Sequence, residues 1–545
     1  SAGFIDNLGT GTKDMNTNEV TGGRVALRWD VSERTAFNLL YLNQSSRVGG
    51  GQGGGFQTPT STYTPILSGV PAMGPPDLGD PSFRTVFDPF RDVDFEVLNL
   101  KLDINFEGFD LALMGATKQR EDYFELGFDI FFGVFDGVTA AHVRQGSEFD
   151  TNTFEARLVS TGDGSLEWIA GVWYEKEDGD FASTDIVETP RIGPVIFGLG
   201  DGEFISDRDE FDDTEELAVY GEVGYRFNDQ AKLTLGYRRA DLKLDSGVLR
   251  ADGVFDAGSR LAIGVDESTQ EDINTYKIHF EYRFNDDILA HALASSGYRA
   301  GGFNRSGLIA VTPASAYGTD TLWNYEVGVR TSWLDNRLTA NAVVYYIDWT
   351  DIQLRTFDLV SLGQKIQNAG NAEIFGLETE IDFQMTDNLR LSMNYGYTDS
   401  SLAEDFVDSS VDRSTTPPTV TEFVAAADGD RLPGSSKHTL TLRAGWQMPL
   451  TASLDLQANL DYRYVSSRTP ALTSGDATFG GFPDVPSSEV VNLSAGVRHD
   501  NGVTLSLFAN NLLDERNIQY QLIAGVEFAT MNRPRTIGLR AGYQF

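Results

Sequence analysis

The chain of 545 residues contains no cysteine, so it can form neither a disulfide framework nor a thiolate metal site. It also lacks any run of about 18 consecutive apolar residues, which a membrane-spanning helix requires. Basic residues are scarce, because 42 Lys and Arg stand against 80 Asp and Glu for a net charge of -38. These features exclude a helical membrane protein and disfavour nucleic acid as a partner, since phosphate binding needs clustered Lys and Arg.

Catalytic and metal-binding motifs are also missing. The five histidines, at 142, 279, 291, 438 and 499, show no metal-ligand spacing. The chain has no P-loop, no HExxH helix and no G-x-S-x-G elbow. The acidic run 201–216 does not fit an EF-hand, because Phe211 and Ala218 occupy ligand positions, so we interpret it as a solvated loop. We therefore assign no enzyme activity, no cofactor and no metal.

The most frequent pattern in the chain is the alternation of apolar and polar residues. In residues 439–446, Leu440, Leu442, Ala444 and Trp446 alternate with polar residues, and the same pattern resumes after a turn at 449–451 and continues to Tyr464. Successive strand side chains face opposite sides, so one face of this hairpin is apolar and the other carries charge. Such strands need only about 9–11 residues to cross a membrane, which is why a mean hydropathy of -0.25 is compatible with a membrane protein.

Similar segments recur along the whole chain and predict about nineteen strands. The predicted ranges are 17–31, 33–46, 93–107, 109–123, 148–161, 165–178, 213–227, 230–245, 271–284, 287–300, 321–334, 337–358, 362–384, 387–403, 435–449, 452–468, 486–499, 502–515 and 533–545. Short Asn-, Asp- and Gly-rich turns alternate with long loops, as in an outer-membrane barrel with short periplasmic turns. The fold class is therefore all-β, a transmembrane antiparallel up-and-down β-barrel. A soluble β-sandwich or propeller is the alternative, but it should not show this alternation of loop length.

The last predicted strand shows the most specific local sequence pattern. Ile537, Leu539, Ala541, Tyr543 and Phe545 alternate with polar residues and glycine, and the chain stops on the aromatic residue. This pattern resembles the C-terminal signal that the outer-membrane barrel assembly machinery reads, in which Tyr543 and Phe545 would be the recognised residues.

Several motifs in order resemble the barrel domain of TonB-dependent receptors, the active transporters of Gram-negative outer membranes. They are Ser296-Gly297-Tyr298-Arg299-Ala300-Gly301-Gly302-Phe303-Asn304, Tyr325-Glu326-Val327-Gly328-Val329-Arg330, Asn368-Ala369-Gly370-Asn371 leading to Glu378, Asn510-Asn511-Leu512-Leu513-Asp514-Glu515, and Arg533-Pro534-Arg535-Thr536. The resemblance spans most of the chain, so we expect residues 1–545 to form one barrel domain.

One departure from that family affects the expected architecture. Family members carry an N-terminal plug and an energy-coupling box before a barrel of twenty-two strands, and neither is present here. Phe4-Ile5-Asp6-Asn7 resembles the loop after the third barrel strand, and the first residues show no signal peptide. Since nineteen antiparallel strands cannot close uniformly, we expect the sequence to be a processed or truncated fragment, or a second chain to supply the rest.

The resemblance implies binding of a scarce nutrient complex, such as an iron–siderophore, followed by TonB-dependent uptake through the plug. It places the protein in the bacterial outer membrane, with outer-membrane lipid, a small-molecule ligand, the TonB complex and the assembly machinery as partners. A passive porin-like channel for small solutes or saccharides is the alternative; it predicts 16–18 strands and a constricting loop.

Candidate ligand contacts lie in the long loops and the upper lumen: Tyr63, Arg299, Asn304 and Arg305. For each, rim packing or simple solvent exposure is the alternative. Three arginines on the polar faces of strands, Arg443, Arg463 and Arg498, are expected to face a plug or carboxylates on adjacent strands.

Overall fold

The computed structural model describes most of the chain and contains strands throughout. It describes residues 3–7, 10–50, 55–57, 82–83, 88–127, 141–162, 164–181, 185–188, 207–252, 266–304, 316–358, 363–412, 419–469, 472, 484–523 and 527–544. Tyr63, Arg305 and Phe545 therefore lie outside the described residues. Within the described ranges, no helix is long and apolar enough to cross a membrane.

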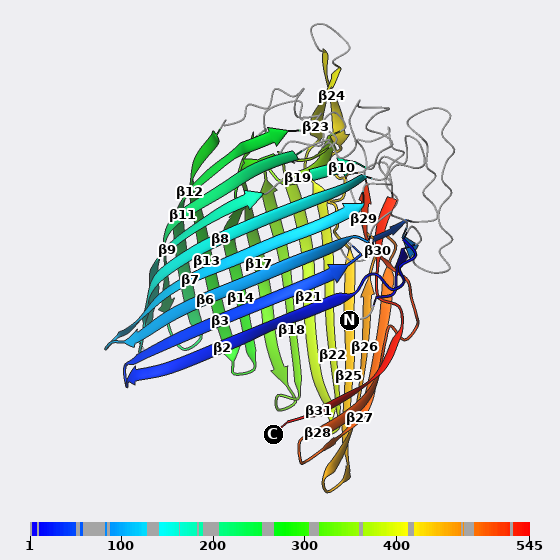
Figure 1. The fold of residues 1–545 in the computed structure, drawn as a ribbon. Helices are drawn as coiled ribbons and strands as arrows, with labels where there is room; N and C mark the ends of the chain where they lie inside the picture. The colour runs from blue at the N-terminus through cyan, green and yellow to red at the C-terminus, as the bar shows by residue number, and fades with distance from the viewer. Residues whose placement is uncertain are drawn as a thin grey trace.

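Nineteen long strands pair antiparallel, each with the next along the series, into one curved sheet (Figure 1). They are β2 (Asn18–Ser32), β3 (Thr35–Gly49), β6 (Phe90–Asn105), β7 (Phe109–Gly127), β8 (Ala141–Ser160), β9 (Leu166–Phe181), β11 (Asp207–Arg226), β12 (Ala231–Asp252), β13 (Asp266–Asn285), β14 (Ile288–Arg299), β17 (Asp320–Trp333), β18 (Leu338–Thr350), β21 (Ala372–Thr386), β22 (Leu389–Leu402), β25 (His438–Thr451), β26 (Leu454–Val465), β27 (Ser488–His499), β28 (Val503–Asn510) and β31 (Thr536–Tyr543). Short β10 (Asp185–Glu188) adds to the edge of β8. The predicted all-β antiparallel architecture with about nineteen strands is confirmed.

Alternation explains why these segments form a barrel wall. On β13, Tyr276, Ile278 and Phe280 share one face, whereas Lys277 and His279 share the other. The apolar face turns outward to lipid, and the polar face turns toward the lumen, because a charged side chain in hydrocarbon is costly.

Two aromatic bands mark the edges of the apolar zone on the outward face. Tyr237 lies directly opposite Tyr276 at the upper edge, and their ring centroids are 5.5 Å apart. At the lower end of β13, Tyr282 and Phe284 meet edge to face at 4.8 Å. The eight-residue step from Tyr276 to Phe284 is about 26 Å along the strand, or about 20 Å along the membrane normal at a tilt of roughly 40°. This spacing suits the apolar band of an outer-membrane barrel.

The wall is taller on one side than on the other. β12 continues upward from Tyr237 to Asp252, whereas β17 begins at Asp320, just above Trp323. β11 begins at Asp207 and pairs with both β9 and β12 over its upper half. The interpretation of 201–216 as a loop is therefore wrong from Asp207 onward. Above the membrane both faces of a strand meet water, so acidic residues can occupy either face of a paired strand.

The expected strands 337–358 and 362–384 are each divided in two. β18 ends at Thr350 and β21 begins at Ala372; between them β19 (Gln353–Asp358) and β20 (Gly363–Asn368) form a separate hairpin. The breaks fall at Asp351 and Gly370, whose positive φ angles of 55° and 83° interrupt the extended backbone. The prediction of two uninterrupted strands was wrong because the alternation continues through the breaks.

Further short strands lie at the upper end of the barrel. β23 (Phe406–Asp412) and β24 (Thr419–Ala426) form a hairpin that rises at the top of Figure 1. Smaller pairings join β15 (Gly302–Phe303) to β16 (Ala316–Tyr317), β1 (Asp6–Asn7) to β5 (Ser82–Phe83), and β30 (Glu527–Met531) to both β29 (Ile518–Ile523) and β4 (Gly55–Gln57). A core of Ile352, Leu402, Phe406 and Leu432 packs beneath the β23–β24 hairpin.

The segment before β2 is tied to the entry of β6 by one carboxylate. Asp88 accepts hydrogen bonds from Asn7 Nδ2 at 2.9 Å, Thr10 Oγ1 at 2.7 Å and Thr12 Oγ1 at 2.6 Å. Burial would raise the pKa of Asp88, but these three hydrogen bonds outweigh it and lower the pKa below its usual value. Asp88 thus anchors this segment in its ionised form.

In the described part of the chain, the strand at each end of the sheet is paired on one side. β2 is exposed at every residue and pairs with β3, whereas β31 pairs with β28. Among the described residues, no pairing joins β2 to β31. Both strands run from the upper loops to the lower turns, so these two edges are parallel.

Candidate functional site

The segment Ser296–Asn304, here called the strap, leaves β14 and crosses the upper inner wall. Tyr298 packs against a buried cluster that includes Leu242 and Ile273. Its hydroxyl accepts a hydrogen bond from Arg238 Nη1 at 3.1 Å and donates one to Glu216 at 3.3 Å. The strap therefore begins by anchoring to β11 and β12.

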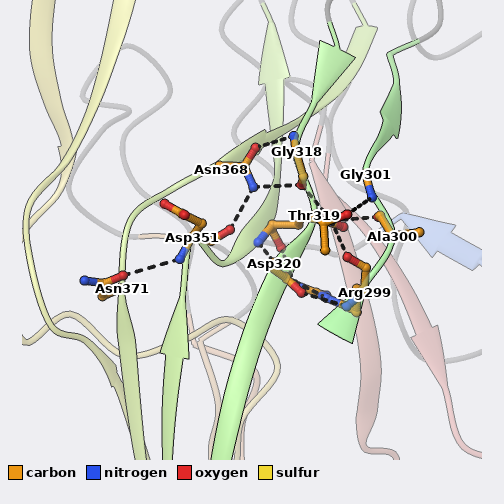
Figure 2. Close-up of polar contacts among 10 residues, drawn as sticks. Arg299, Ala300, Gly301, Gly318, Thr319, Asp320, Asp351, Asn368 and Asn371 are labelled. Atoms are coloured by element: carbon orange, nitrogen blue, oxygen red, sulfur yellow. Dashed lines mark hydrogen bonds and ion pairs between the residues drawn. The ribbon is translucent and has the colours of Figure 1, made fainter. Parts of the chain in front are cut away.

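Arg299 is the centre of the strap. Its Nε donates to Asp320 Oδ2 at 2.9 Å, and its Nη2 also contacts that carboxylate (Figure 2). Its guanidinium lies 4.6 Å from the ring centroid of Trp349. The Asp320 side chain is 1% exposed, and it also accepts the backbone N–H of Gln353 at 2.9 Å. A buried carboxylate needs such partners, because an unpaired one would be strongly destabilising.

Two amide side chains join the strap to neighbouring connections. Gln353 Nε2 donates to the carbonyls of Ala300 at 2.8 Å and Gly318 at 3.1 Å. Asn368 accepts the N–H of Gly318 at 2.8 Å and donates to the carbonyls of Gly318 and Asp351 (Figure 2). Three chain connections are thereby fixed to one another at the floor of the upper loops.

Two predicted ligand contacts lie in this network. Arg299 is engaged as described, and Asn304 Nδ2 donates to the Ile366 carbonyl at 2.6 Å while Asn304 Oδ1 accepts the Ile366 N–H. Both side chains thus hold the chain's own backbone at the rim. The other two candidates, Tyr63 and Arg305, lie outside the described residues.

Below this floor, the inner wall contains a hollow of 610 Å³, here called the luminal hollow. Most of its lining residues lie in two adjacent rows that run across β17, β18, β21, β22 and β25: Arg330, Asn341, Glu380, Asn394 and Thr441 in one, and Val343, Glu378, Gly396 and Thr439 in the other. Thr379 and Tyr395, which lie between the rows in sequence, complete the lining. The second row leaves space at Gly396, which has no side chain between Glu378 and Thr439. Within the described residues, neither Arg330 nor Glu378 has a hydrogen-bond or ion-pair partner.

Elsewhere the inner wall mostly pairs its own charges. Arg443 donates to Asp461 at 3.1 Å, and Arg498 donates to Asp455 at 3.0 Å. These two predicted plug-facing arginines therefore bind carboxylates on adjacent strands. Arg463 is exposed and has no hydrogen-bond or ion-pair partner in the described part of the chain.

The taller wall carries carboxylates on its inner face. Thr151 Oγ1 donates to Glu177 at 2.7 Å, and Thr153 Oγ1 donates to Glu175 at 3.1 Å. In the described ranges, no group of three or more His, Cys, Asp or Glu side chains could hold a metal ion. The carboxylates of Glu175 and Glu177 add negative charge to the upper lumen, which Lys118, 3.7 Å from Glu177, partly offsets.

Sequence reasoning missed most of the partners at the strap. Asp320, Trp349 and Gln353 were not singled out, and Asn368 was quoted in a motif but not as a site residue. Each lies in a separate part of the chain, and the fold brings it near Arg299. One available signal was that Asn368 is the first residue of a quoted motif and that Asp320 lies shortly before another, at Tyr325. Tyr543, expected in the assembly signal, lies on the outward face of β31 and is 65% exposed.

The sequence model of a family described as "TonB dependent receptor-like, beta-barrel" matches residues 23–512. The chain belongs to the TonB-dependent receptor β-barrel family. It is accordingly a β-barrel protein of the Gram-negative outer membrane, and the family and its structural neighbours are transport receptors.

Individual relatives of this TonB-dependent receptor barrel are distant. The chain is 24% identical over 393 residues to the metal-pseudopaline receptor CntO of Pseudomonas aeruginosa, covering 70% of this chain and 50% of that protein. It thus spans half or less of the curated relatives it matches. The ferric yersiniabactin uptake receptor FyuA of Yersinia pestis has a similar fold, with a TM-score of 0.75 at 16% identity over 100% of this chain and 74% of the other. The ferric-catecholate import receptor Fiu of E. coli K12 gives 0.72 at 14% identity over 99% and 76%.

Proposed function

We propose that the intact protein is an outer-membrane uptake receptor that binds a metal–chelator complex of the siderophore type and imports it with energy relayed by TonB. The observation that carries the proposal is the family match over residues 23–512, which covers all of the nineteen paired strands except β31 and the first residues of β2. The metal-complex and ferric-siderophore receptors among the relatives support the choice of ligand class.

The inner wall also carries polar groups that could contact a ligand on its way through the barrel. The luminal hollow of 610 Å³ presents Arg330 and Glu378 without partners in the described residues, so these groups are available to a luminal plug or to a passing ligand. Arg463 offers a third such group on β26. Polar groups of this kind are costly to leave unpaired once water is displaced.

The charge of the chain limits the class of metal complex that we expect it to bind. The chain carries a net charge of -38, and the taller wall presents carboxylates such as Glu175 and Glu177 to the upper lumen. A wall of one charge sign repels ligands of that sign and concentrates those of the opposite sign. We therefore favour a neutral or cationic metal complex over a strongly anionic one.

Two measurements on cells that express the intact protein test the proposal. Surface binding and internal accumulation of a labelled metal complex would be followed separately, in strains with and without functional TonB. We expect binding in both strains and accumulation in the TonB-containing strain alone. Accumulation that is independent of TonB and unsaturable would instead support the passive channel.

The ligand class is tested by competition. Neutral, cationic and anionic chelates of the same metal would be offered to the same cells at several salt concentrations. We expect the anionic chelate to compete least, and its disadvantage to shrink as salt screens the wall. Preferential uptake of the anionic chelate at low salt would contradict the charge argument while leaving TonB dependence intact.

A further inference from the structure

The inner face of the taller wall carries two arginines that share one carboxylate. Arg91 Nε donates to Asp122 Oδ1 at 2.8 Å, and Arg120 Nη2 donates to Asp122 Oδ2 at 2.8 Å. Burial would raise the pKa of Asp122, but the hydrogen bonds from Arg91 and Arg120 outweigh it and lower the pKa, so the carboxylate stays ionised. Because arginine is always protonated, the three groups together keep one positive charge, here called the positive pole.

The positive pole is accessible from the lumen. The side chains of Arg91 and Arg120 are 31% and 43% exposed, whereas that of Asp122 is 7% exposed. In the described part of the chain, neither arginine contacts a second carboxylate. The buried carboxylate therefore holds both guanidinium groups in place, and their remaining N–H donors are available to an oxyanion.

Two carboxylates on β9 form a negative pole two strands away. Glu177 accepts a hydrogen bond from Thr151 at 2.7 Å, and Glu175 accepts one from Thr153 at 3.1 Å. Lys118 lies 3.7 Å from Glu177, whereas Glu175 contacts no cation within the described ranges. The threonine hydroxyls fix both carboxylates without neutralising them, so the charge of Glu175 remains available.

Strand register sets the distance between the two poles. Arg120 lies opposite Phe149 on β8, and Phe149 lies opposite Gly179 on β9. Glu177 and Glu175 follow two and four residues below Gly179. From the spacing of strands and the rise per residue, the α-carbon of Arg120 is about 12 Å from that of Glu177 and about 16 Å from that of Glu175. One small molecule can therefore reach both poles.

An apolar ring lies between the poles. A methyl group at Gly179 would be 3.3 Å from the ring of Phe149, so this ring lies against β9, and it meets Phe181 edge to face at 5.1 Å. The five side chains of this surface, here called the amphoteric patch, are Arg91, Arg120, Phe149, Glu175 and Glu177. Across the neighbouring strands β6 to β9 the patch thus presents a positive, an apolar and a negative part in order (Figure 1).

We propose that the amphoteric patch binds metal chelates that carry an oxyanion at one end and a protonated amine at the other. The inference rests on the proposed uptake function and narrows its ligand class to amphoteric complexes. The oxyanion accepts hydrogen bonds from the positive pole, the amine donates to Glu175, and the apolar part of the chelator lies against Phe149. A chelate without ionic groups would leave both poles unpaired as water is displaced.

The test uses four ferric trihydroxamates on cells that express the intact protein but lack functional TonB, so that surface binding is measured alone. One probe has no ionic group, one has an ammonium group, one has a carboxylate, and one has both at opposite ends. Arg120→Gln and Glu175→Gln remove one charge from each pole. Lys176→Gln and Asp178→Asn are the matched controls, because these residues pair at 2.7 Å on the outward face of the strand that carries Glu175.

We expect Arg120→Gln to weaken binding of the two carboxylate-bearing probes about tenfold, as expected for one lost contact to a charged group. Glu175→Gln should weaken the two ammonium-bearing probes by a similar factor. The outward-face variants should bind all four probes as the unmodified protein does. Heat-modified gel migration verifies that each variant is folded, and Arg120→Met or Glu175→Met replaces a variant that is not.

Three binding results would overturn the proposal: equal losses for all four probes, equal losses in the outward-face variants, or unchanged binding in Arg120→Gln and Glu175→Gln. Accumulation of the same probes in a TonB-containing strain separates this inference from the proposed function. TonB-dependent accumulation without charge-selective losses would overturn the amphoteric patch alone. Absence of TonB-dependent accumulation for every probe would overturn the proposed function on which the patch rests.

Discussion

The buried carboxylate of Asp320 accepts several of the hydrogen bonds that hold the strap. It accepts the backbone N–H and the guanidinium of Arg299 and the backbone N–H of Gln353, and its side chain is 1% exposed. Asp320→Asn keeps the shape but replaces one acceptor oxygen with a donor that faces other donors. We expect local opening of the strap to become easier by about 2 kcal/mol, the scale of a hydrogen bond to a charged group. Hydrogen exchange at the amides of Arg299 and Gln353 measures this.

A second ion pair serves as the control for that prediction. Arg443 and Asp461 are also paired across neighbouring strands, but their side chains are 62% and 43% exposed. Such pairs contribute roughly 0–1 kcal/mol, so Arg443→Ala should leave exchange along β25 nearly unchanged. Equal effects at the two sites would show that burial of Asp320 does not strengthen its contacts.

Asp88 gives the segment before β2 a dependence on pH. Its pKa is lowered in the folded protein, because hydrogen bonds from Thr12, Thr10 and Asn7 overcome the effect of burial. The stabilisation is therefore present above the unfolded value near pH 4 and is lost as pH falls through the lower folded pKa. We expect residues 4–17 to become sensitive to an acid-active protease in that range. Asp88→Asn should already be sensitive at neutral pH, and unchanged protection in this variant would contradict the prediction.

At the scale of strands, register places carboxylates directly opposite one another above the membrane. On the outward face, Asp94 lies opposite Glu121, Glu121 opposite Glu148, and Glu148 opposite Asp180 across β6, β7, β8 and β9. Like charges that face each other across strands are destabilising. The acidity of this wall thus opposes its own pairing, and the long ladders of backbone hydrogen bonds hold it together.

Neutralising the middle of that row should therefore stabilise the wall. We expect Glu121→Gln to raise stability by about 0.5 kcal/mol and to weaken the dependence of the melting temperature on salt. Thermal unfolding at low and high salt measures both effects. Glu222→Gln is the matched control, because Glu222 is paired with Lys277 at 2.9 Å and its loss should be destabilising. A lower melting temperature for Glu121→Gln would contradict the argument.

The sequence predicted the strands well where one face meets lipid and failed where both faces meet water. Within the apolar zone of β13, strict alternation identified the strand. Above the membrane that constraint disappears, so the paired residues 207–212 of β11 had the composition of a loop. The break between β18 and β19 was missed because a single positive φ at Asp351 changes the backbone without changing the alternation.

The candidate site was predictable in its motifs but not in its contacts. The motif containing Arg299 and Asn304 drew attention to the strap. Strand register brings Asp320 beside Arg299, and the β19–β20 hairpin brings Ile366 beside Asn304. Composition and spacing do not indicate which residues come together in this way. The hydrogen bonds of Arg299 and Asn304 to other parts of the chain could therefore be identified from the three-dimensional structure alone.

At the scale of the whole molecule, the direction of the two outer strands limits how the barrel can be completed. β2 and β31 both descend toward the lower turns, and no pairing joins them in the described residues. Antiparallel closure then requires an odd number of strands between them, whereas direct contact would give a parallel pair. Exposed backbone edges are not tolerated in lipid. We propose that another segment of the intact protein, or a second chain, supplies an odd number of strands.

Engineered cysteines can distinguish the two closures, because the chain has no cysteine of its own. Outward positions on β2, such as Val25 and Leu27, would be combined with Leu539 and Ala541 on β31 in the intact protein under mild oxidation. Intervening strands would separate the edges by about 10 Å or more, since neighbouring strands are about 4.8 Å apart, and a disulfide cannot bridge that distance. We expect no cross-link in any combination, whereas Leu27→Cys with Leu39→Cys, which lie opposite each other on β2 and β3, tests whether the oxidation works. Efficient linkage between β2 and β31 would show instead that nineteen strands close directly through a parallel pair.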